Sequence, residues 1–314
     1  LLNILMNEFD LIREYFTWSI EDPSVALGVG DDAALFSLEQ GYQLVTTTDT
    51  LTEGIHFGEN APAKDIAHKS LAVNLSDIAA MGAKAKYFTL AISLPKIDRS
   101  WLREFSDSLR QLSERYEVSL IGGDTTRGPL NITITMIGIV ESSKALTRSG
   151  AQPGDGVYVS GSIGDAGFCF WKLSNDFVPS NQELERLNCP IPRIELGLEL
   201  KSLASACIDI SDGLEQDLSH ILEASSVGAV VEVNKIPLSE ALHVHVKDTD
   251  DWSIPLCGGD DYELCFTIPE GKEEALKIVS ESCNVNITRI GVVSESLGLQ
   301  IEGFDGPRKS YRHF

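Results

Sequence analysis

The first half of the chain switches between strand-like and helix-like spacing of its apolar residues. The stretch 43–50 is rich in Val and Thr and predicts a strand, and 130–141 alternates polar and apolar residues with a period of two. Between them, apolar residues three and four apart in 98–116 predict a helix that Asp98 caps. The predicted elements are a helix at 5–18, strands at 33–37 and 43–50, a helix from 62 to 82, a strand at 87–95, a helix at 98–116, and strands at 118–124 and 130–141. This order predicts an α/β or α+β layer with strands of mixed direction.

The second half again alternates strands and helices, after a segment rich in Gly, Pro and polar residues. That segment, TRSGAQPGDG at 147–156, predicts a domain boundary. A chain of 314 residues suits two domains, which we place at 1–146 and 147–314, the second of α/β type. The predicted elements are a strand, a glycine turn and a helix within 157–173, helices at 193–205 and 213–226, and strands at 229–233, 254–257, 262–267 and 287–293.

The charge balance and the cysteines restrict the class of protein. The chain has 25 basic and 47 acidic residues, a net charge of −22, which argues against a nucleic-acid partner. A run of about 18 apolar residues is missing, so no membrane span is expected. All six cysteines lie in the second half without a C-x-x-C pair, which favours reduced thiols and a cytoplasmic location.

Aspartates stand at the ends of predicted elements, beside Gly, Ser or Thr. They are Asp31, Asp32, Asp49, Asp77, Asp124, Asp209 and Asp212. Magnesium takes one or two carboxylates and completes its shell with water and phosphate oxygens, which suits such scattered residues. For any one of these aspartates capping is the favoured explanation, whereas for the whole group a shared metal site and ordinary caps both remain open. On the helix after Pro62, Ser70, Asn74 and Asp77 share a face, and this spacing alone favours solvent exposure.

Other sequence features bear on phosphate binding and on catalytic bases. No G-x-x-x-x-G-K-[ST] or G-x-S-x-G motif occurs, which excludes a P-loop and a serine elbow. The turn GSIGDAG at 161–167 could present backbone N–H groups to a phosphate, although such turns also form without a ligand. His56 is the single histidine between the strand and helix of 44–82, and a substrate contact is favoured there. His243 and His245, two residues apart, are expected at the surface.

Seven motifs, in chain order, carry a resemblance to a known family. They are GVGDDAAL, TTTDTLTEGIHF, KSLAVNLSDIAAMGA, LIGGDTTRGPL, ALTRSGAQPGD, IDISDGLEQDL and GGDDYELCF. Together they resemble the thiamine-monophosphate kinases, which convert thiamine monophosphate into thiamine diphosphate with ATP and Mg²⁺. The resemblance runs from about Glu8 to the C-terminal YRHF. It implies the two-domain fold of the aminoimidazole ribonucleotide synthetase superfamily, and a homodimer whose N-terminal strands form a shared barrel.

The resemblance also implies the roles of individual residues. Magnesium ligands fall on Asp32, Thr47, Thr48, Asp49, Asp77, Asp124, Asp209 and Asp212. Nucleotide contacts fall on Gly122, Gly123, Asp124, Arg148 and Ser211, and thiamine monophosphate contacts on His56, Asp260 and Tyr311. The residues expected to matter most for catalysis are Asp49, Asp77, Asp124 and Arg148. The chain departs from the family at Asp260, where the usual residue is Glu.

The implied reaction is direct in-line transfer of the γ-phosphoryl group, without a phosphoenzyme, as the last step of thiamine diphosphate synthesis. Two alternatives stay open at this point. One is another ATP-dependent member of the superfamily that acts on a different phosphate or acid. The other is an inactive homologue that binds nucleotide and Mg²⁺.

Overall fold

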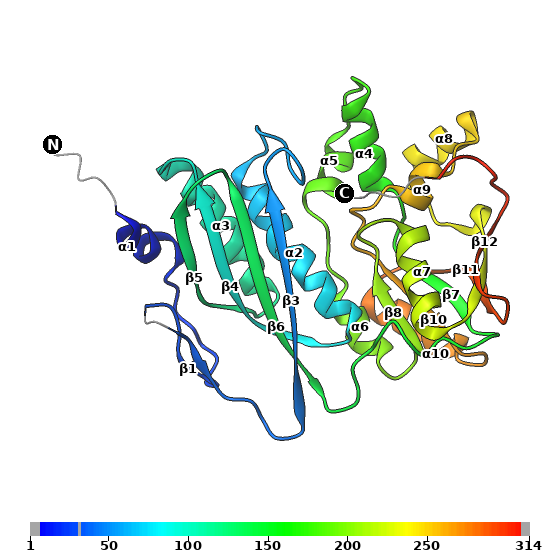
Figure 1. The fold of residues 1–314 in the computed structure, drawn as a ribbon, viewed down its shortest axis with the longest axis horizontal. Helices are drawn as coiled ribbons and strands as arrows, with labels where there is room; N and C mark the ends of the chain where they lie inside the picture. The colour runs from blue at the N-terminus through cyan, green and yellow to red at the C-terminus, as the bar shows by residue number, and fades with distance from the viewer. Residues whose placement is uncertain (1–6, 31–32, 309–314) are drawn as a thin grey trace. The chain divides into compact units, whose positions relative to one another are not determined.

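The computed structural model describes residues 7–30 and 33–308, which form two compact units (Figure 1). The N-terminal unit contains the chain up to Ile78 together with Lys84–Ser142. The C-terminal unit contains Ala79–Ala83 and the chain from Ser143 onward. Each unit has its own sheet, and the two are described separately.

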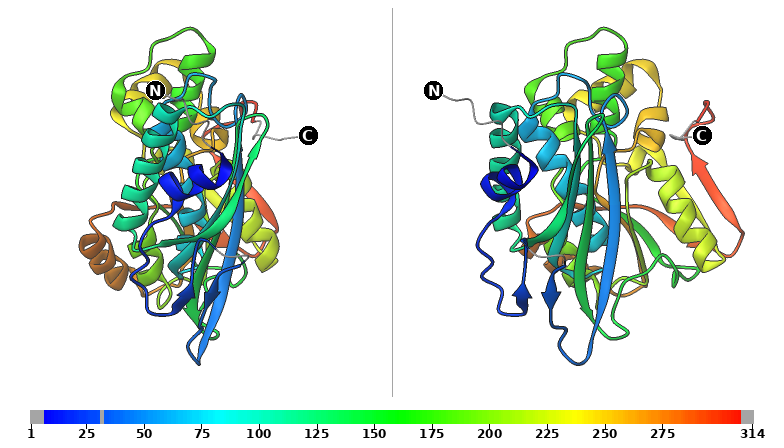
Figure 2. Two further views of the ribbon diagram at one scale, coloured as in Figure 1. Left: turned by 90° about the vertical axis from the view of Figure 1, so that its left-hand side faces the viewer. Right: turned by 60° about the vertical axis from the view of Figure 1, so that its left-hand side comes forward.

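The N-terminal unit is built on a four-stranded sheet with two long helices on one face. Its strands are β3 (Tyr42–Thr52), β4 (Lys84–Leu94), β5 (Ser119–Arg127) and β6 (Asn131–Glu141), and its helices are α2 (Ala63–Ala80) and α3 (Arg99–Arg115). The strand order is β3-β6-β4-β5, with β4 and β5 parallel and the other pairs antiparallel. Both helices cover the same face of the sheet (Figure 2). The predicted mixed sheet is therefore confirmed, as an open sheet in the described chain.

The side-chain alternation of β3 decides which residues can meet the helices. Leu51 is buried, and Thr47 and Asp49, which share its face, are partly buried. Leu44 and Thr48 point to the other face and are exposed, as neighbouring residues of a strand must point to opposite sides. We call this second face, which α2 and α3 do not cover, the open face.

The N-terminal segment is less helical than its spacing predicts. A helix over 5–18 is expected, whereas the structure has one α-helical turn followed by a π-helix, and the predicted strand at 33–37 shortens to two residues. These elements are α1 (Glu8–Leu11), η1 (Ile12–Phe16), β1 (Val25–Leu27) and β2 (Leu35–Phe36). Asn7 and Asp10 form a capping box at the start of α1, which fixes where the helix begins.

The C-terminal unit is built on a six-stranded sheet. Its strands are β7 (Gly156–Ser160), β8 (Ala206–Asp209), β9 (Gly228–Glu232), β10 (Leu264–Ile268), β11 (Ile287–Ser294) and β12 (Gly298–Glu302). Its helices are α4 (Asp165–Ser174), α5 (Asn181–Asn188), α6 (Ile194–Leu200), α7 (Leu214–Ser225), α8 (Glu240–Thr249), α9 (Ser253–Cys257) and α10 (Glu273–Cys283), with a 3-10 turn η2 (Val233–Lys235). The strand order is β12-β9-β11-β7-β10-β8, and only the β9–β12 pair is parallel among the described strands. Apolar residues of the central strands pack with Leu214, Leu218 and Ile221 of α7 to form the main core.

The sequence-based expectations for this unit need three corrections. The predicted strand at 254–257 is the helix α9, because Pro255 lies in its first turn, where the missing N–H costs nothing, whereas in a strand it would remove a ladder hydrogen bond. The helix expected at 193–205 ends at Leu200. The helices α5, α8 and α10 and the strand β12 were not expected, because their apolar residues are sparse or their segments short.

The polar stripe on α2 is also corrected. Ser70 and Asn74 are buried, whereas the spacing favoured solvent exposure. The stripe faces the sheet, so its polar groups must find partners inside the unit. Within residues 7–30 and 33–308, no helix is both long and apolar enough to cross a membrane.

Candidate active site

Asp49 on β3 and Asp77 on α2 form a carboxylate pair in the N-terminal unit. The hydroxyl of Thr47, which shares the face of Asp49, donates a hydrogen bond to the Asp77 carboxylate. Burial and the negative charge of Asp77 raise the pKa of Asp49 to about 7. A buried carboxylate beside a second negative charge is an arrangement that a bound cation stabilises. The donor set of two carboxylates and a hydroxyl fits a hard cation such as Mg²⁺.

The helix α2 brings further buried polar groups next to this pair. The side-chain amide of Asn74, one turn before Asp77, donates to the Ser70 carbonyl at 3.1 Å, and its Oδ1 has no hydrogen-bond partner among the described residues. Lys69 is buried, and its Nζ lies 3.5 Å from the His56 carbonyl oxygen. The Nδ1 of His56 accepts the Thr52 N–H at 3.1 Å, so the neutral ring carries its proton on Nε2. The loop that holds His56 is therefore anchored to both β3 and α2.

Asp124 is not brought to this pair within the N-terminal sheet. It pairs with Ala91 of β4, which pairs with Thr133 of β6. Thr133 in turn pairs with Thr50 of β3, so Asp124 points to the open face. It also lies three strands from β3, a separation of about 14 Å at ordinary strand spacing. Asp124 and Asp49 therefore face opposite sides of the sheet.

Two other predicted residues in this unit are placed by their strands. The hydroxyl of Thr48 lies on the open face, 2.9 Å from that of Thr135, and away from Asp77. Gly123 passes so close to β4 that a Cβ there would lie 1.9 Å from the Leu90 carbonyl oxygen. Only glycine fits at this position. Asp32 and Tyr311, and also Asp31, lie outside the described residues.

In the C-terminal unit, four predicted residues lie together at one end of the sheet. Asp209 is the last residue of β8 and is buried, and Ser211 and Asp212 follow in the loop before α7. The N–H of Asp260 donates to the Ser211 carbonyl at 2.8 Å. Asp260 itself has a φ of +61° and Tyr262 a φ of +52°, and the Tyr262 hydroxyl donates to Asp260 Oδ1 at 2.9 Å. Two residues with side chains in the left-handed region mark a strained turn, which is common at functional sites.

Arg148 lies elsewhere in this unit. Its carbonyl accepts a hydrogen bond from the Ser225 hydroxyl at 3.2 Å, at the C-terminal end of α7. Ser211 lies before the first residue of the same helix, about 17 Å away for twelve residues at the usual rise. The structure therefore does not bring the Arg148 backbone to Ser211.

The glycine turn at 161–167 uses its backbone N–H groups internally. Gly161 donates to Asn286, Ile163 to Pro237, and Gly164 to the Asp261 carboxylate at 2.7 Å. These bonds support the interpretation of the turn as a structural one. Burial raises the pKa of Asp261 to about 8, so this carboxyl is mostly protonated at neutral pH.

A buried ion-pair network behind this turn was missed by the sequence reasoning, although Glu263 lies inside the quoted GGDDYELCF. Glu263 is 1% exposed and accepts hydrogen bonds from Ser160 at 2.5 Å and from Arg193 Nε at 2.7 Å. A second Arg193 nitrogen lies 2.5 Å and an Arg186 nitrogen 3.4 Å from Glu263 Oε1. Gly161, with φ of +60°, stands so close that a Cβ would lie 2.1 Å from this oxygen. Arginines of the protein thus fully neutralise Glu263.

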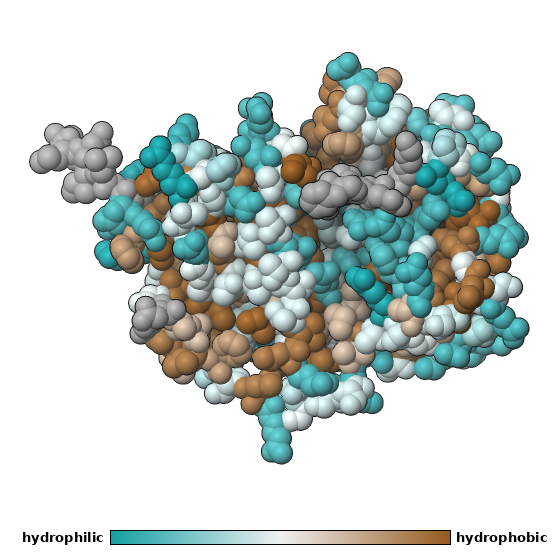
Figure 3. All heavy atoms as spheres, viewed as in Figure 1, coloured by the Kyte–Doolittle hydropathy of each residue, from teal (hydrophilic) through white to brown (hydrophobic). Residues whose placement is uncertain are grey.

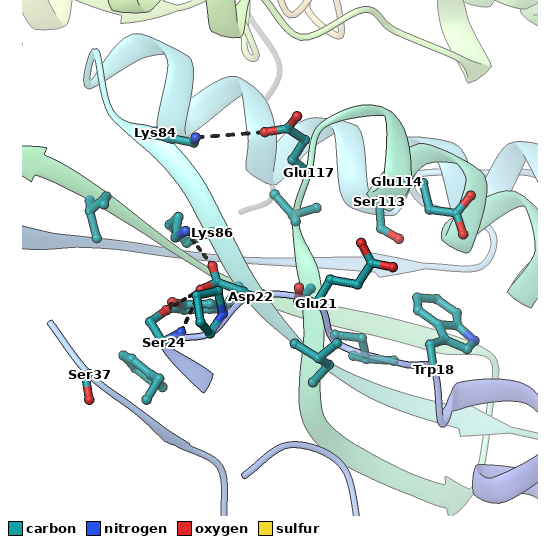
Figure 4. A pocket seen from close by; sticks show the side chains of 18 of the residues that line it. Trp18, Glu21, Asp22, Ser24, Ser37, Lys84, Lys86, Ser113, Glu114 and Glu117 are labelled. Atoms are coloured by element: carbon teal, nitrogen blue, oxygen red, sulfur yellow. Dashed lines mark hydrogen bonds and ion pairs between the residues drawn. The ribbon is translucent and has the colours of Figure 1, made fainter. Parts of the chain in front are cut away.

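A pocket of about 780 Å³ lies in the N-terminal unit, between the segment 18–24 and the strands β4 and β5 (Figure 4). Lys86 pairs with Asp22, and Lys84 lies 3.9 Å from Glu117, at its wall. None of the predicted site residues that the structure describes lines it. In the described part of the chain, no three His, Cys, Asp or Glu side chains are close enough to hold a metal ion. A cation at Asp49 and Asp77 would therefore complete its shell with other oxygens, such as those of water and phosphate.

Comparisons with known proteins place the chain in a family. The model of AIR synthase related protein, N-terminal domain, matches residues 30–140, and that of the C-terminal domain matches residues 152–303. The thiamine-monophosphate kinase of Haemophilus influenzae is 46% identical over 93% of this chain and 91% of its own.

Solved structures agree with these matches. The crystal structure of thiamine-monophosphate kinase from Stenotrophomonas maltophilia superposes with a TM-score of 0.87 at 41% identity, and covers 95% of this chain and 96% of that one. AaThiL complexed with AMPPCP and TMP superposes with a TM-score of 0.79 at 29% identity, over 98% and 96% of the two chains. The chain belongs to the AIR synthase related proteins and, within them, to the thiamine-monophosphate kinase family of enzymes.

Proposed function

We propose that this chain transfers the γ-phosphoryl group of ATP to the phosphate of thiamine monophosphate, which yields thiamine diphosphate and ADP. The observation that carries the proposal is the identity to thiamine-monophosphate kinases along almost the whole chain. One of these relatives is named as a complex with AMPPCP and TMP, an ATP analogue and the acceptor. The acceptor phosphate has a second pKa near 6 and is largely ionised at neutral pH. It can attack the γ-phosphorus directly, without a general base or a phosphoenzyme.

The cation proposed here is Mg²⁺, in several copies. Asp49, Asp77 and Thr47 fit one ion, because burial and the charge of Asp77 raise the pKa of Asp49, and a cation there would favour its ionised form. The remaining proposed ligands are Asp32, Thr48, Asp124, Asp209 and Asp212. When bound, Mg²⁺ neutralises phosphate charge in the transferring groups.

The remaining residues of the site would bind and orient the two substrates. Gly122, Gly123, Arg148 and Ser211 are proposed to contact ATP, with Arg148 as a two-pronged donor to its phosphates. His56, Asp260 and Tyr311 are proposed to contact thiamine monophosphate. We assign metal binding, ATP binding and dimerisation to residues 1–146. Residues 147–314 are proposed to complete the nucleotide and substrate site.

A homodimer is part of the proposal, and the open face of the N-terminal sheet supports it. This face carries Thr48, Thr50 and Leu44, which is 49% exposed, and it looks apolar or weakly polar over β3 and β6 (Figure 3). A second copy would cover it, with the strands of both chains forming a barrel. Asp124 points to the same face, so a partner chain would also bury this proposed ligand.

The dimer is tested by Leu44→Glu. A buried charge at a contact between copies is costly, so we expect light scattering to give half the mass of the original protein. Val178→Glu is the matched control, because Val178 is 91% exposed in the C-terminal unit, and it should keep the original mass. A Leu44→Glu protein of unchanged mass contradicts the proposed interface.

The reaction is tested by incubation with ATP, Mg²⁺ and thiamine monophosphate. Thiamine diphosphate and ADP should form in equal amounts. ADP formed only with a different acceptor identifies another ATP-dependent activity of the superfamily. Nucleotide binding without ADP identifies an inactive homologue.

A further inference from the structure

Asp217, in the first turns of α7, holds the loop that precedes this helix. Its side chain is buried, and its Oδ2 accepts three successive backbone N–H groups. The distances are 2.9 Å to Ser211, 3.0 Å to Asp212 and 3.1 Å to Gly213. Two of these residues have proposed roles in binding nucleotide and cation, whereas Asp217 has none.

The same loop is held from its other side by the turn that carries Asp260. The N–H groups of Asp260 and Tyr262 donate to the carbonyls of Ser211 and Ile210, each at 2.8 Å. Gly259 allows this approach, since a Cβ there would lie 2.5 Å from the Ser211 carbonyl oxygen. The N–H groups of the loop donate to Asp217, and the loop carbonyls accept hydrogen bonds from the turn that carries Asp260. The loop backbone therefore has little conformational freedom.

We propose that Asp217 is a positioning residue that fixes the backbone of Ile210–Gly213 in the conformation that binds Mg²⁺-nucleotide. Through the Ser211–Asp260 hydrogen bond, this loop also positions the turn that carries Asp260, a proposed contact of thiamine monophosphate. Ordering a loop residue on binding costs conformational entropy, and a loop ordered in advance avoids that cost. This inference rests on the proposed function, which gives Ser211, Asp212 and Asp260 their roles.

The test measures binding of AMPPCP with Mg²⁺ to the full chain by calorimetry, and thermal unfolding without ligand. Asp217→Ala leaves three N–H groups without their acceptor, and we expect affinity to fall about 10- to 100-fold, as for other residues that orient metal ligands. Asp217→Asn keeps an oxygen acceptor in place and should restore most of the affinity. Asp217→Glu shifts the carboxylate by one methylene and should bind about 10-fold more weakly, which decides the matter if the alanine variant does not fold.

Asp155→Ala is the matched control. Asp155 is equally buried and also caps a turn, accepting the Gln152 N–H at 3.0 Å and the Ser205 hydroxyl at 2.5 Å. It precedes β7 and lies beside the start of β8, at the opposite end of these strands from Asp209. Its loss should lower the unfolding temperature without changing affinity.

Several results would overturn the proposal. One is Asp217→Ala or Asp217→Glu binding with the original affinity. Another is an equal loss of affinity in the Asp155 and Asp217 alanine variants, which indicates a general effect of stability. An unmodified protein that binds Mg²⁺-AMPPCP but makes no thiamine diphosphate would refute the proposed function, while the affinities would still decide the role of Asp217.

Discussion

One carboxylate of each unit, Glu263 in the C-terminal unit and Asp49 in the N-terminal unit, has its charge treated in an opposite way. In the C-terminal unit, Glu263 is enclosed by Arg193 and Arg186, so its charge is balanced by the protein itself. In the N-terminal unit, burial and the charge of Asp77 raise the pKa of Asp49 to about 7. A carboxylate balanced by arginines holds the fold together. Asp49 is buried beside a second negative charge and favours a cation from outside, so it is a candidate ligand, whereas Glu263 is a structural acid.

The largest effect on stability should come from breaking the ion pairs between Glu263 and its two arginines. Arg193→Met leaves Glu263 buried without its two-pronged partner, and we expect the free energy of unfolding to fall by about 3–5 kcal/mol, measured by urea denaturation. Adding Glu263→Gln removes the stranded charge and should recover part of the loss. If the free energy of unfolding of Arg193→Met alone stays within about 0.5 kcal/mol of the original protein, the Arg193–Glu263 pair is solvated and the prediction is wrong.

The next largest effect concerns the pair formed by Asp49 and Asp77. Asp49→Asn should lower turnover about 100- to 1,000-fold, since it removes charge that would hold a cation at the phosphates. Its unfolding temperature without Mg²⁺ should stay the same or rise, because the repulsion with Asp77 is gone. Asp22→Asn is the control, because Asp22 is already paired with Lys86. This substitution should leave turnover of the folded protein near normal. Near-normal turnover of Asp49→Asn would refute the metal-site assignment.

The smallest effect, taken over one pH unit, is a pH dependence of stability in the C-terminal unit. Burial raises the pKa of Asp261 to about 8, so between about pH 4 and 8 the folded protein keeps a proton that the unfolded chain releases. This group therefore makes stability fall as the pH rises across that window. Asp261→Asn should match the original protein near pH 4 and lose less stability toward pH 8. Parallel curves for the two proteins would contradict a proton on Asp261.

The sequence predicted more of the N-terminal unit than of the C-terminal one, for physical reasons. The strand around Asp49 is rich in Val and Thr, and the helix that bears Asp77 runs from Pro62 toward Gly82, so both are predicted and both form. The segment 254–257 is short and apolar and has no periodicity of its own, so only packing decides that it becomes a helix.

In the site, too, the arrangement of residues depends on packing that the sequence pattern does not show. Thr47 and Asp77 are 30 residues apart, and their hydrogen bond depends on how α2 packs against β3. The separation of Asp124 from Asp49 depends on the order of four strands, which spacing along the chain does not contain. The roles of Asp217 and Glu263 depend on which buried groups surround them. Both residues lie inside motifs that the sequence analysis quotes for other residues. The motifs therefore drew attention to these segments, but they do not show which groups Asp217 and Glu263 contact in the fold.

The contact between Gly161 and Glu263 has a consequence for the history of the family. Because even a methyl group at 161 would overlap the carboxylate, a larger residue there would displace Glu263 from its place between Arg193 and Arg186. The four positions should therefore be inherited together, as a single character that changes all at once or not at all.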